Sequence, residues 1–200
     1  MNKPTLKKIT KLTNNKWANM YTYEYEYNNK PVIYYVASRH KVSVKTASHF
    51  SPDAVIVLPY FEDDEGIKVV FIKQFRYAVN NFIYDVPAGI IDKGESPKES
   101  AIREIEEEIG GTVQKLELCT KLCYTSPGCH NETTATFFAK VKLDKQQNLQ
   151  DDEIIEMHIV PLDNILDFVE DKVMGVQGKM MAKIFYYQQK LKQAQKQKTL

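Results

Sequence analysis

Residues 96–110 constrain the fold of this chain more than any other part of the sequence. Ser96 is a favourable N-cap residue, Pro97 suits the first position of a helix, and Glu99 completes a capping box. Gly110 supplies the left-handed conformation in which helices commonly end. The pattern therefore predicts an α-helix over residues 96–109. Four apolar residues at helical spacing predict the side that packs on a sheet: Ala101, Ile102, Ile105 and Ile109.

The same helix carries three glutamates that converge on its other side. Glu104 and Glu107 stand at i,i+3 and Glu104 and Glu108 at i,i+4, so their negative charges repel one another. A solvated acidic face is one interpretation of this pattern. The other is a site for a hard divalent cation, Mg²⁺ or Mn²⁺ rather than Zn²⁺, because all the ligands would be oxygens. Arg103, on the same helix, can hold a carboxylate in place.

The spacing of these residues resembles the signature motif of the Nudix hydrolases, the Nudix box. That motif is a glycine, five residues, a glutamate, seven residues, and then Arg-Glu-aliphatic-any-Glu-Glu-any-Gly. Eight positions of this chain match it: Gly89, Glu95, Arg103, Glu104, Ile105, Glu107, Glu108 and Gly110. Gly111 departs from the pattern, since the family usually has an aliphatic residue there. The resemblance implies the Nudix fold, an α+β architecture in which a mixed β-sheet is sandwiched by helices.

Three further segments are similar to the ADP-ribose pyrophosphatase branch of the family, namely residues 74–77, 85–89 and 126–128. The resemblance implies Mg²⁺-dependent hydrolysis of ADP-ribose or related ADP-sugars to AMP and ribose 5-phosphate, with Mn²⁺ as the alternative ion. Two other functions stay open. One is hydrolysis of another nucleoside diphosphate-X, such as a nucleotide sugar or a dinucleoside polyphosphate. The other is a Nudix module that senses a nucleotide without cleaving it.

The resemblance also implies a role for individual residues. Metal binding falls to the side chains of Glu104, Glu107 and Glu108 and to the backbone carbonyl of Ala88. Catalytic roles fall to Arg103, Glu107, Asp151 and Glu153. Glu95 and Gly89 would position these groups without binding the metal ion themselves. Substrate contacts fall to Gln74, Arg76, Pro127 and Gly128.

Two of these assignments compete with simpler interpretations. The acidic residues 150–156 are either a loop that supplies the general base, with Glu153 as first choice and Asp151 as second, or an exposed acidic turn. Arg76 either grips phosphate or ribose oxygens with its forked guanidinium or pairs with an acid at the surface.

The first 50 residues predict a separate β-rich domain, and residues 51–200 the catalytic domain. Tyrosines alternate with polar residues over residues 21–27, which is the period of a strand with one aromatic face. A turn at residues 28–30 and a second β-rich run at residues 32–36 predict a small antiparallel sheet. The resemblance implies that this sheet forms a homodimer contact. Further strands are expected at residues 54–58, 69–72, 116–124, 134–141 and 154–160, and a second helix at residues 179–193.

Composition limits the partners. Lys and Arg number 27 against 26 Asp and Glu, so the formal net charge of +1 provides no global field for nucleic acid. No apolar run approaches the roughly 18 residues that a membrane span needs. Cys119, Cys123 and Cys129 are odd in number and clustered, which favours the reducing cytoplasm and buried thiols. His40 has no identifiable partner in the sequence.

Overall fold

The computed structural model describes residues 2–47 and 51–197 of the 200-residue chain. The chain folds into two compact units. The first unit comprises the described residues up to Asp53 together with Leu122–Thr134. The second unit comprises Ala54–Lys121 and the described residues from Ala135 onward. A domain boundary at residue 50 stays a prediction, whereas the grouping of Leu122–Thr134 with the N-terminal residues is a finding of the structure.

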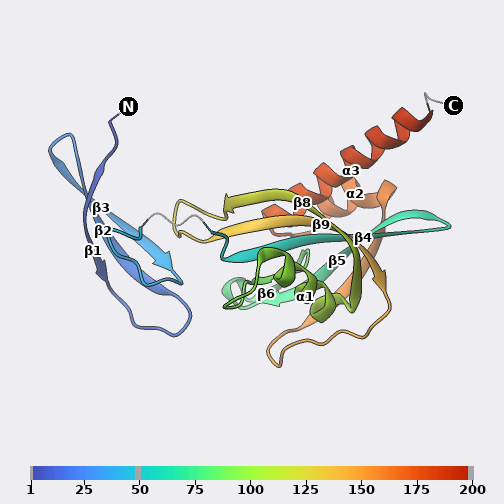
Figure 1. The fold of residues 1–200 in the computed structure, drawn as a ribbon, viewed down its shortest axis with the longest axis horizontal. Coiled ribbons are helices and arrows are strands. Elements are labelled where there is room, and N and C mark those ends of the chain that lie inside the picture. Colours follow the sequence, from blue (N-terminus) through green and yellow to red (C-terminus); the bar gives the residue numbers. More distant parts are fainter. Residues whose placement is uncertain (1, 48–50, 198–200) are drawn as a thin grey trace. The chain divides into compact units, whose positions relative to one another are not determined.

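The first unit contains a three-stranded antiparallel sheet in the order β1-β2-β3 (Figure 1). Its strands are β1 (Thr5–Lys11), β2 (Asn19–Tyr27) and β3 (Lys30–Ser38). Asn28 and Asn29 both have positive φ, 50° and 59°, which is the conformation that a two-residue hairpin turn requires. The two predicted strands and the turn are confirmed. Strand β1 was not expected, because its residues are mostly lysine and threonine and show little apolar alternation.

The second unit is built on a seven-stranded sheet with the order β10-β5-β4-β9-β8, to which β6 and β7 add by pairing with β5 and β4. The strands are β4 (Ala54–Asp63), β5 (Gly66–Arg76), β6 (Asn81–Asp85), β7 (Ala88–Ile90), β8 (Gly111–Tyr124), β9 (Thr133–Leu143) and β10 (Ile155–Pro161). The helices are α1 (Pro97–Ile109), α2 (Ile165–Asp171) and α3 (Val176–Gln197), with 3-10 turns at Tyr77–Val79 and Leu162–Asn164.

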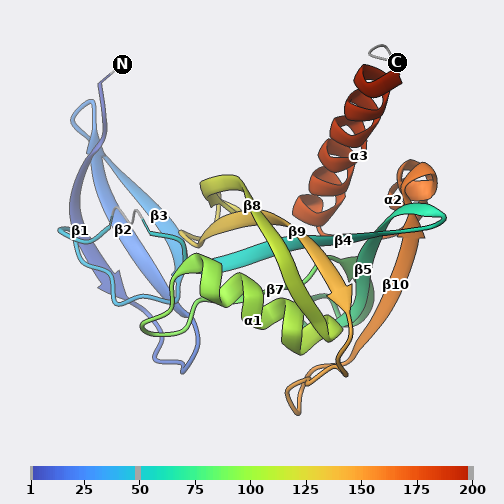
Figure 2. The ribbon, with the colours of Figure 1, turned by 45° about the vertical axis from the view of Figure 1, so that its right-hand side comes forward.

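Both faces of this sheet are covered by helices. Val70 and Ile72 of β5 pack in one buried cluster with Ile105 of α1, whereas Phe71 of the same strand packs in the other with Phe185 of α3. Alternate side chains of a strand point to opposite faces, so α1 lies on one side of the sheet and α2 and α3 on the other. Figure 2 shows α1 running along the sheet, with α2 and α3 well separated from α1. The α+β class and the helix-covered sheet are confirmed.

Three details of the sequence interpretation were wrong. Ile102 is 43% exposed, because the buried positions of α1 are taken by Ala101, Ile105 and Ile109 together with two glutamates. Two thiols, Cys123 and Cys129, are exposed, and all three cysteines are free. The elements α2, β6 and β7 were missed, since each is seven residues or shorter. Among the described residues, no helix is long and apolar enough to cross a membrane.

Candidate active site

The capping residues at both ends of α1, the helix that carries the glutamates, act as the sequence predicts. The Ser96 side chain accepts a hydrogen bond from the Glu99 backbone N–H, and Glu99 accepts one from the Ser96 backbone N–H at 2.7 Å. Pro97 opens the helix, and Gly110 ends it with a φ of 61°. The glutamates therefore stand on a rigid, doubly terminated element rather than on a loop.

Glu104 and Glu108 are buried, with 5% and 2% of their surface exposed. Burial raises the pKa of both carboxyls, that of Glu108 well above its usual range, and the charge of Glu104 raises the pKa of Glu108 further. The backbone N–H of Ala88 donates to Glu108 Oε2 at 3.3 Å. A solvated acidic face is therefore wrong for these two residues. Of the other two glutamates in this part of the helix, Glu106 is exposed and Glu107 is half-buried.

Arg103 connects the acidic residues. Its Nε and Nη2 donate to the two carboxylate oxygens of Glu95 at 2.9 and 3.0 Å. Its Nη1 donates to Glu104 Oε1 at 2.6 Å and to Glu107 Oε2 at 3.2 Å, and Nη2 also reaches the carbonyl of Ile90. This forked contact holds the pKa of Glu95 at about 2. Arg103 thus offsets part of the negative charge and orients the carboxylates.

Gly89 leaves the space that Glu104 occupies. A Cβ at this position would lie 1.8 Å from Glu104 Oε1 and 2.1 Å from its Cδ. Gly89 lies in the centre of β7, which pairs with β4, so the backbone there has little freedom to move aside. The glycine of the motif is therefore required by the close approach of a carboxylate.

The acidic loop before β10 supplies one half-buried carboxylate. Glu153 accepts a hydrogen bond from the backbone N–H of Gln150 at 2.9 Å, and its charge raises the pKa of both Glu104 and Glu108. Asp151 is exposed to solvent. This electrostatic effect favours Glu153 over the exposed Asp151 as the general base, and the choice between them stays a prediction.

Gln74 and Arg76 lie at the end of β5. Gln74 shares the strand face of Ile72, which packs with α1, and only 7% of its surface is exposed. Its Nε2 has no hydrogen-bond partner in the part of the chain that the structure describes. Arg76 is exposed, and its positive charge lowers the pKa of Glu108.

Pro127 and Gly128 belong to the first unit. There the carbonyl of Gly128 accepts a hydrogen bond from the Tyr34 hydroxyl at 2.6 Å. The other sequence-predicted residues lie in the second unit, and direct contacts join six of them into one cluster around Arg103: Ala88, Gly89, Glu95, Glu104, Glu107 and Glu108.

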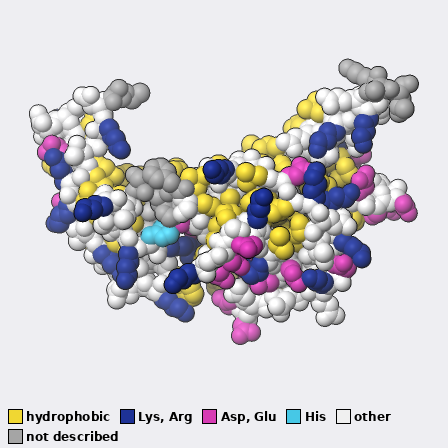
Figure 3. All heavy atoms as spheres, viewed as in Figure 1, with side chains coloured by type: hydrophobic (Ala, Val, Ile, Leu, Met, Phe, Trp, Pro, Cys, Tyr) yellow, Lys and Arg dark blue, Asp and Glu magenta, His cyan; other side chains and the backbone are white. Residues whose placement is uncertain are grey.

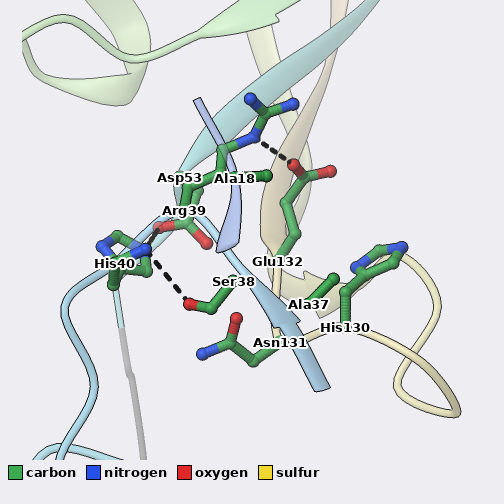
Figure 4. A pocket seen from close by; sticks show the side chains of 9 residues that line it. All are labelled: Ala18, Ala37, Ser38, Arg39, His40, Asp53, His130, Asn131 and Glu132. Carbon is green, nitrogen blue, oxygen red and sulfur yellow. Dashed lines mark hydrogen bonds and ion pairs between the residues drawn. The ribbon is translucent and has the colours of Figure 1, made fainter. Parts of the chain in front are cut away.

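A polar cavity of about 250 Å³ in the first unit was missed by the sequence reasoning. Figure 4 shows Arg39 reaching Glu132, at 2.8 Å, and His40 against Asp53, whose Oδ1 lies 2.6 Å from the imidazole Nε2. The prediction that His40 lacks a partner was wrong. No local signal marks this cavity, because Arg39 and Glu132 are 93 positions apart in the chain.

The carboxylate oxygens of Glu104 and Glu108 fit the chemistry of a binding site for a small divalent cation. Glu104 and Glu108 bury two carboxylates side by side, and burial of paired anions is costly unless a cation neutralises them. Within the described residues, no three His, Cys, Asp or Glu side chains converge on a point. Mg²⁺ is commonly bound through one or two carboxylates, with waters and substrate phosphates as the remaining ligands, so a three-carboxylate cage is not required. Figure 3 shows Asp and Glu side chains gathered in the region where α1 is drawn in Figure 1.

The contact of Arg103 with Glu95 predicts a pH-dependent contribution to stability. The pKa of Glu95 is lowered from 4.5 to about 2, so the ionised form stabilises the fold above pH 4.5, and this contribution is lost as the pH falls from 4.5 toward 2. We expect Glu95→Gln to lower the melting temperature by a few degrees at pH 7. The deficit should shrink as the pH falls below 4.5, measured by thermal unfolding at pH 7, 5, 4 and 3.

A suitable control is Glu106→Gln. Glu106 lies on the same helix as Glu95's partner Arg103, and its carboxylate forms an exposed ion pair with Lys145, which lies outside the helix. Its effect should be small at every pH and should fade in high salt. A Glu95→Gln deficit that is equally large at pH 7 and pH 3 would contradict the role assigned to this ion pair.

The family model and the similar proteins found by comparison point to the same family. The model of the NUDIX domain matches residues 50–184. The chain is 41% identical over 123 residues to the ADP-ribose pyrophosphatase of Bacillus subtilis (strain 168), covering 60% of this chain and 64% of that protein. It is 30% identical over 162 residues to the ADP-sugar pyrophosphatase of Mus musculus, covering 76% and 73% of the two chains.

A solved structure shares the fold. The crystal structure of an ADP compounds hydrolase superimposes with a TM-score of 0.73 over 97% of both chains, at 19% sequence identity. At that identity the likeness concerns the fold alone. The matched region with the Bacillus subtilis protein spans less than two thirds of that relative.

Proposed function

This chain is a member of the Nudix family, and from that premise we propose that it hydrolyses the pyrophosphate bond of ADP-ribose or a related ADP-sugar, releasing AMP and ribose 5-phosphate from ADP-ribose. The observation that carries the proposal is the buried pair Glu104 and Glu108 on a helix whose Arg103 also holds Glu95. Relatives named ADP-ribose and ADP-sugar pyrophosphatases support the substrate class.

The reaction requires a divalent metal ion, which we propose to be Mg²⁺, with Mn²⁺ as the alternative. The residues that would hold it are Glu104, Glu108 and the backbone carbonyl of Ala88, assisted by Glu107. When bound, such an ion neutralises pyrophosphate charge and lowers the pKa of a water ligand. A cation at this position also removes the repulsion between the two buried carboxylates.

The remaining residues orient the groups that react. Arg103 holds Glu104 and Glu107 through one nitrogen, Nη1, and Glu95 anchors the other side of the guanidinium. Glu153 is the general base that takes the proton of the attacking water, with Asp151 as the second choice because it is more exposed.

Substrate contacts come from two places. Arg76 grips phosphate or ribose oxygens through its forked guanidinium, and the buried amide of Gln74 has an Nε2 donor that the described residues leave unpaired. A substrate contact of Pro127 and Gly128, in the loop that follows β8, is proposed from the family resemblance of residues 126–128 alone. The unpaired donor of Gln74 supports a polar ligand at this end of β5, since buried donors normally have a partner.

Two alternative functions are separated by experiment. Another nucleoside diphosphate-X substrate would use the same carboxylates and differ only in the groups that contact the X moiety. A nucleotide-sensing module without catalysis is disfavoured, because such a module has no need for two buried carboxylates whose mutual repulsion destabilises the fold.

We also propose a homodimer formed through the first unit. Ile33 and Tyr35 of the edge strand β3 are each 61% exposed. The proposed pairing surface is the stretch of β3 before Ala37, whose N–H already donates to the Cys129 carbonyl, since exposed apolar edge strands commonly pair. Neither nucleic acid nor a membrane is proposed as a partner, and the free cysteines support the cytoplasm as the compartment.

The test is hydrolysis by the purified protein of a small panel with Mg²⁺, Mn²⁺ or EDTA. The panel contains ADP-ribose, ADP-glucose, GDP-mannose, NADH, diadenosine polyphosphates and 8-oxo-dGTP, with products separated by chromatography. Preferential release of AMP from ADP-ribose, abolished by EDTA, is the expected result. Preference for another compound would replace the substrate, and binding of ADP-ribose without turnover of any compound would favour the sensor.

A further inference from the structure

The C-terminal end of α1 is bound by a short segment that follows β9. The last carbonyls of a helix lack partners within the helix and must be satisfied elsewhere. Here the backbone N–H of Lys145 donates to the carbonyl of Gly110 at 3.0 Å, and the backbone N–H of Asn148 donates to that of Glu107 at 2.8 Å. Between them, Gln147 Nε2 donates to the carbonyl of Glu108 at 2.5 Å. We call residues 145–148 the tether.

The tether lies very close to the helix end. A Cβ at Gly110 would lie 2.3 Å from the carbonyl oxygen of Lys145, so the two backbones touch where the helix stops. Gly110 therefore serves both the left-handed helix end and the passage of the tether.

The tether leads directly to the turn that carries Glu153. This turn is closed by two hydrogen bonds, from the Glu153 N–H to the Gln150 carbonyl at 3.0 Å and from the Gln150 N–H to the Glu153 carboxylate. Beyond it, Ile155 pairs with Gln74 at the start of β10. The turn is thus held on both sides: the residues before it bind the end of α1, and the residues after it pair with β5.

Gln147 makes the partly buried side-chain contact of the tether. The other side-chain contact, from Lys145 Nζ to Glu106 Oε1, joins two exposed groups, and such ion pairs contribute little. The Gln147 amide instead reaches the backbone of Glu108, the residue whose carboxylate is buried at the proposed metal site. The Gln147 amide therefore adds a side-chain hydrogen bond to the two backbone hydrogen bonds that join the loop to the helix that presents the carboxylates.

We propose that Gln147 is a positioning residue for pyrophosphate cleavage, fixing the 145–153 segment to the end of α1 so that the turn that carries Glu153 keeps its place next to this end of the helix. This inference rests on the proposed function. It predicts that loss of the amide affects turnover through Glu153 and leaves substrate binding nearly unchanged, because Gln74 and Arg76 lie on β5.

The variant is Gln147→Met, which keeps the length of the side chain and removes the donor. The matched control is Gln146→Met, since Gln146 is exposed and its side chain makes no hydrogen bond within residues 2–47 and 51–197. We expect Gln147→Met to lower kcat for ADP-ribose about tenfold, with KM changed less than about twofold, and Gln146→Met to change neither.

A double-mutant cycle identifies the route of the effect. In the Glu153→Gln background, Gln147→Met should lower kcat by less than about twofold further, because the group that it positions is already gone. An equal tenfold loss in both backgrounds would overturn the proposal and assign Gln147 a purely structural role.

Hydrogen exchange tests the tether without turnover or metal. Gln147→Met should make the amides of residues 145–153 exchange several-fold faster than in the wild type, and Gln146→Met should not. Unchanged exchange would overturn the tether even if kcat falls. If the wild type cleaves no compound of the panel, the proposed function fails, while faster exchange in Gln147→Met would still support the tether.

Discussion

Replacing Glu108 with glutamine is expected to lower kcat for ADP-ribose about 10³-fold while the protein stays folded. Glu108 is 2% exposed and lies beside Glu104, so its carboxylate is one of two buried oxygen ligands available to a cation. Glutamine has the same shape but no charge. It therefore removes the attraction for a divalent ion with little change in packing, and the loss should appear at saturating ADP-ribose.

The stability of this variant should change in the opposite direction. Without metal, burial and the charge of Glu104 raise the pKa of Glu108, so an ionised carboxylate is unfavourable there. We expect the melting temperature of Glu108→Gln in EDTA to equal or exceed that of the wild type, and the stabilisation by added Mg²⁺ to be lost.

The control for this prediction is Glu106→Gln, two positions earlier on the exposed side of the same helix. It should keep both kcat and the stabilisation by Mg²⁺. A Glu108→Gln protein with a near-normal turnover rate would contradict the assignment of Glu108 as a metal ligand, and a protein that does not fold would contradict the argument on burial.

Replacing Gly89 with alanine should damage both the fold and the reaction. The new methyl group would lie 1.8 Å from Glu104 Oε1, and a contact that short cannot exist without movement of the carboxylate or of β7. We expect a loss of about 1–3 kcal/mol in the free energy of unfolding, as for overpacked cores, and a fall in kcat of about 10²-fold. Urea unfolding and initial rates measure the two effects.

A second glycine separates these effects. Gly66 has a φ of 115° in the hairpin between β4 and β5, and a Cβ there would meet nothing within 4 Å. Gly66→Ala should therefore lower stability through backbone strain and leave kcat per folded molecule unchanged. If Gly89→Ala behaves in the same way, the close approach to Glu104 has no catalytic importance.

The parts of this molecule that local chemistry determines could be predicted from the sequence. The helix α1 follows from Ser96, Pro97, Glu99 and Gly110, because each residue acts on the backbone within one turn of its own position. The β2–β3 hairpin follows in the same way from its alternating tyrosines and its two asparagines.

The failures share a different cause. Ile102 was assigned to the buried side because an apolar residue at helical spacing normally packs inward, yet Glu104 and Glu108 are buried on α1 and Ile102 is exposed. The partners of His40 and Gln147 lie 13 and 39 positions away in the chain, in elements joined only by the tertiary fold. No single-sequence pattern carries such pairings.

The composition of the first unit has a consequence for how such a protein can be rearranged. Two stretches of chain are joined within it, since Ala37 N–H donates to the Cys129 carbonyl and Arg39 pairs with Glu132. A truncation after residue 53 would leave the N-terminal sheet without residues 122–134, and grafting the first 53 residues onto another protein would omit the partners of Ala37 and Arg39. An exchange of the first unit between related proteins therefore has to transfer both stretches of chain, and a chimera joined at a single point within residues 54–121 would lose the hydrogen bond of Ala37 and the ion pair of Arg39 unless the other parent supplies equivalent partners.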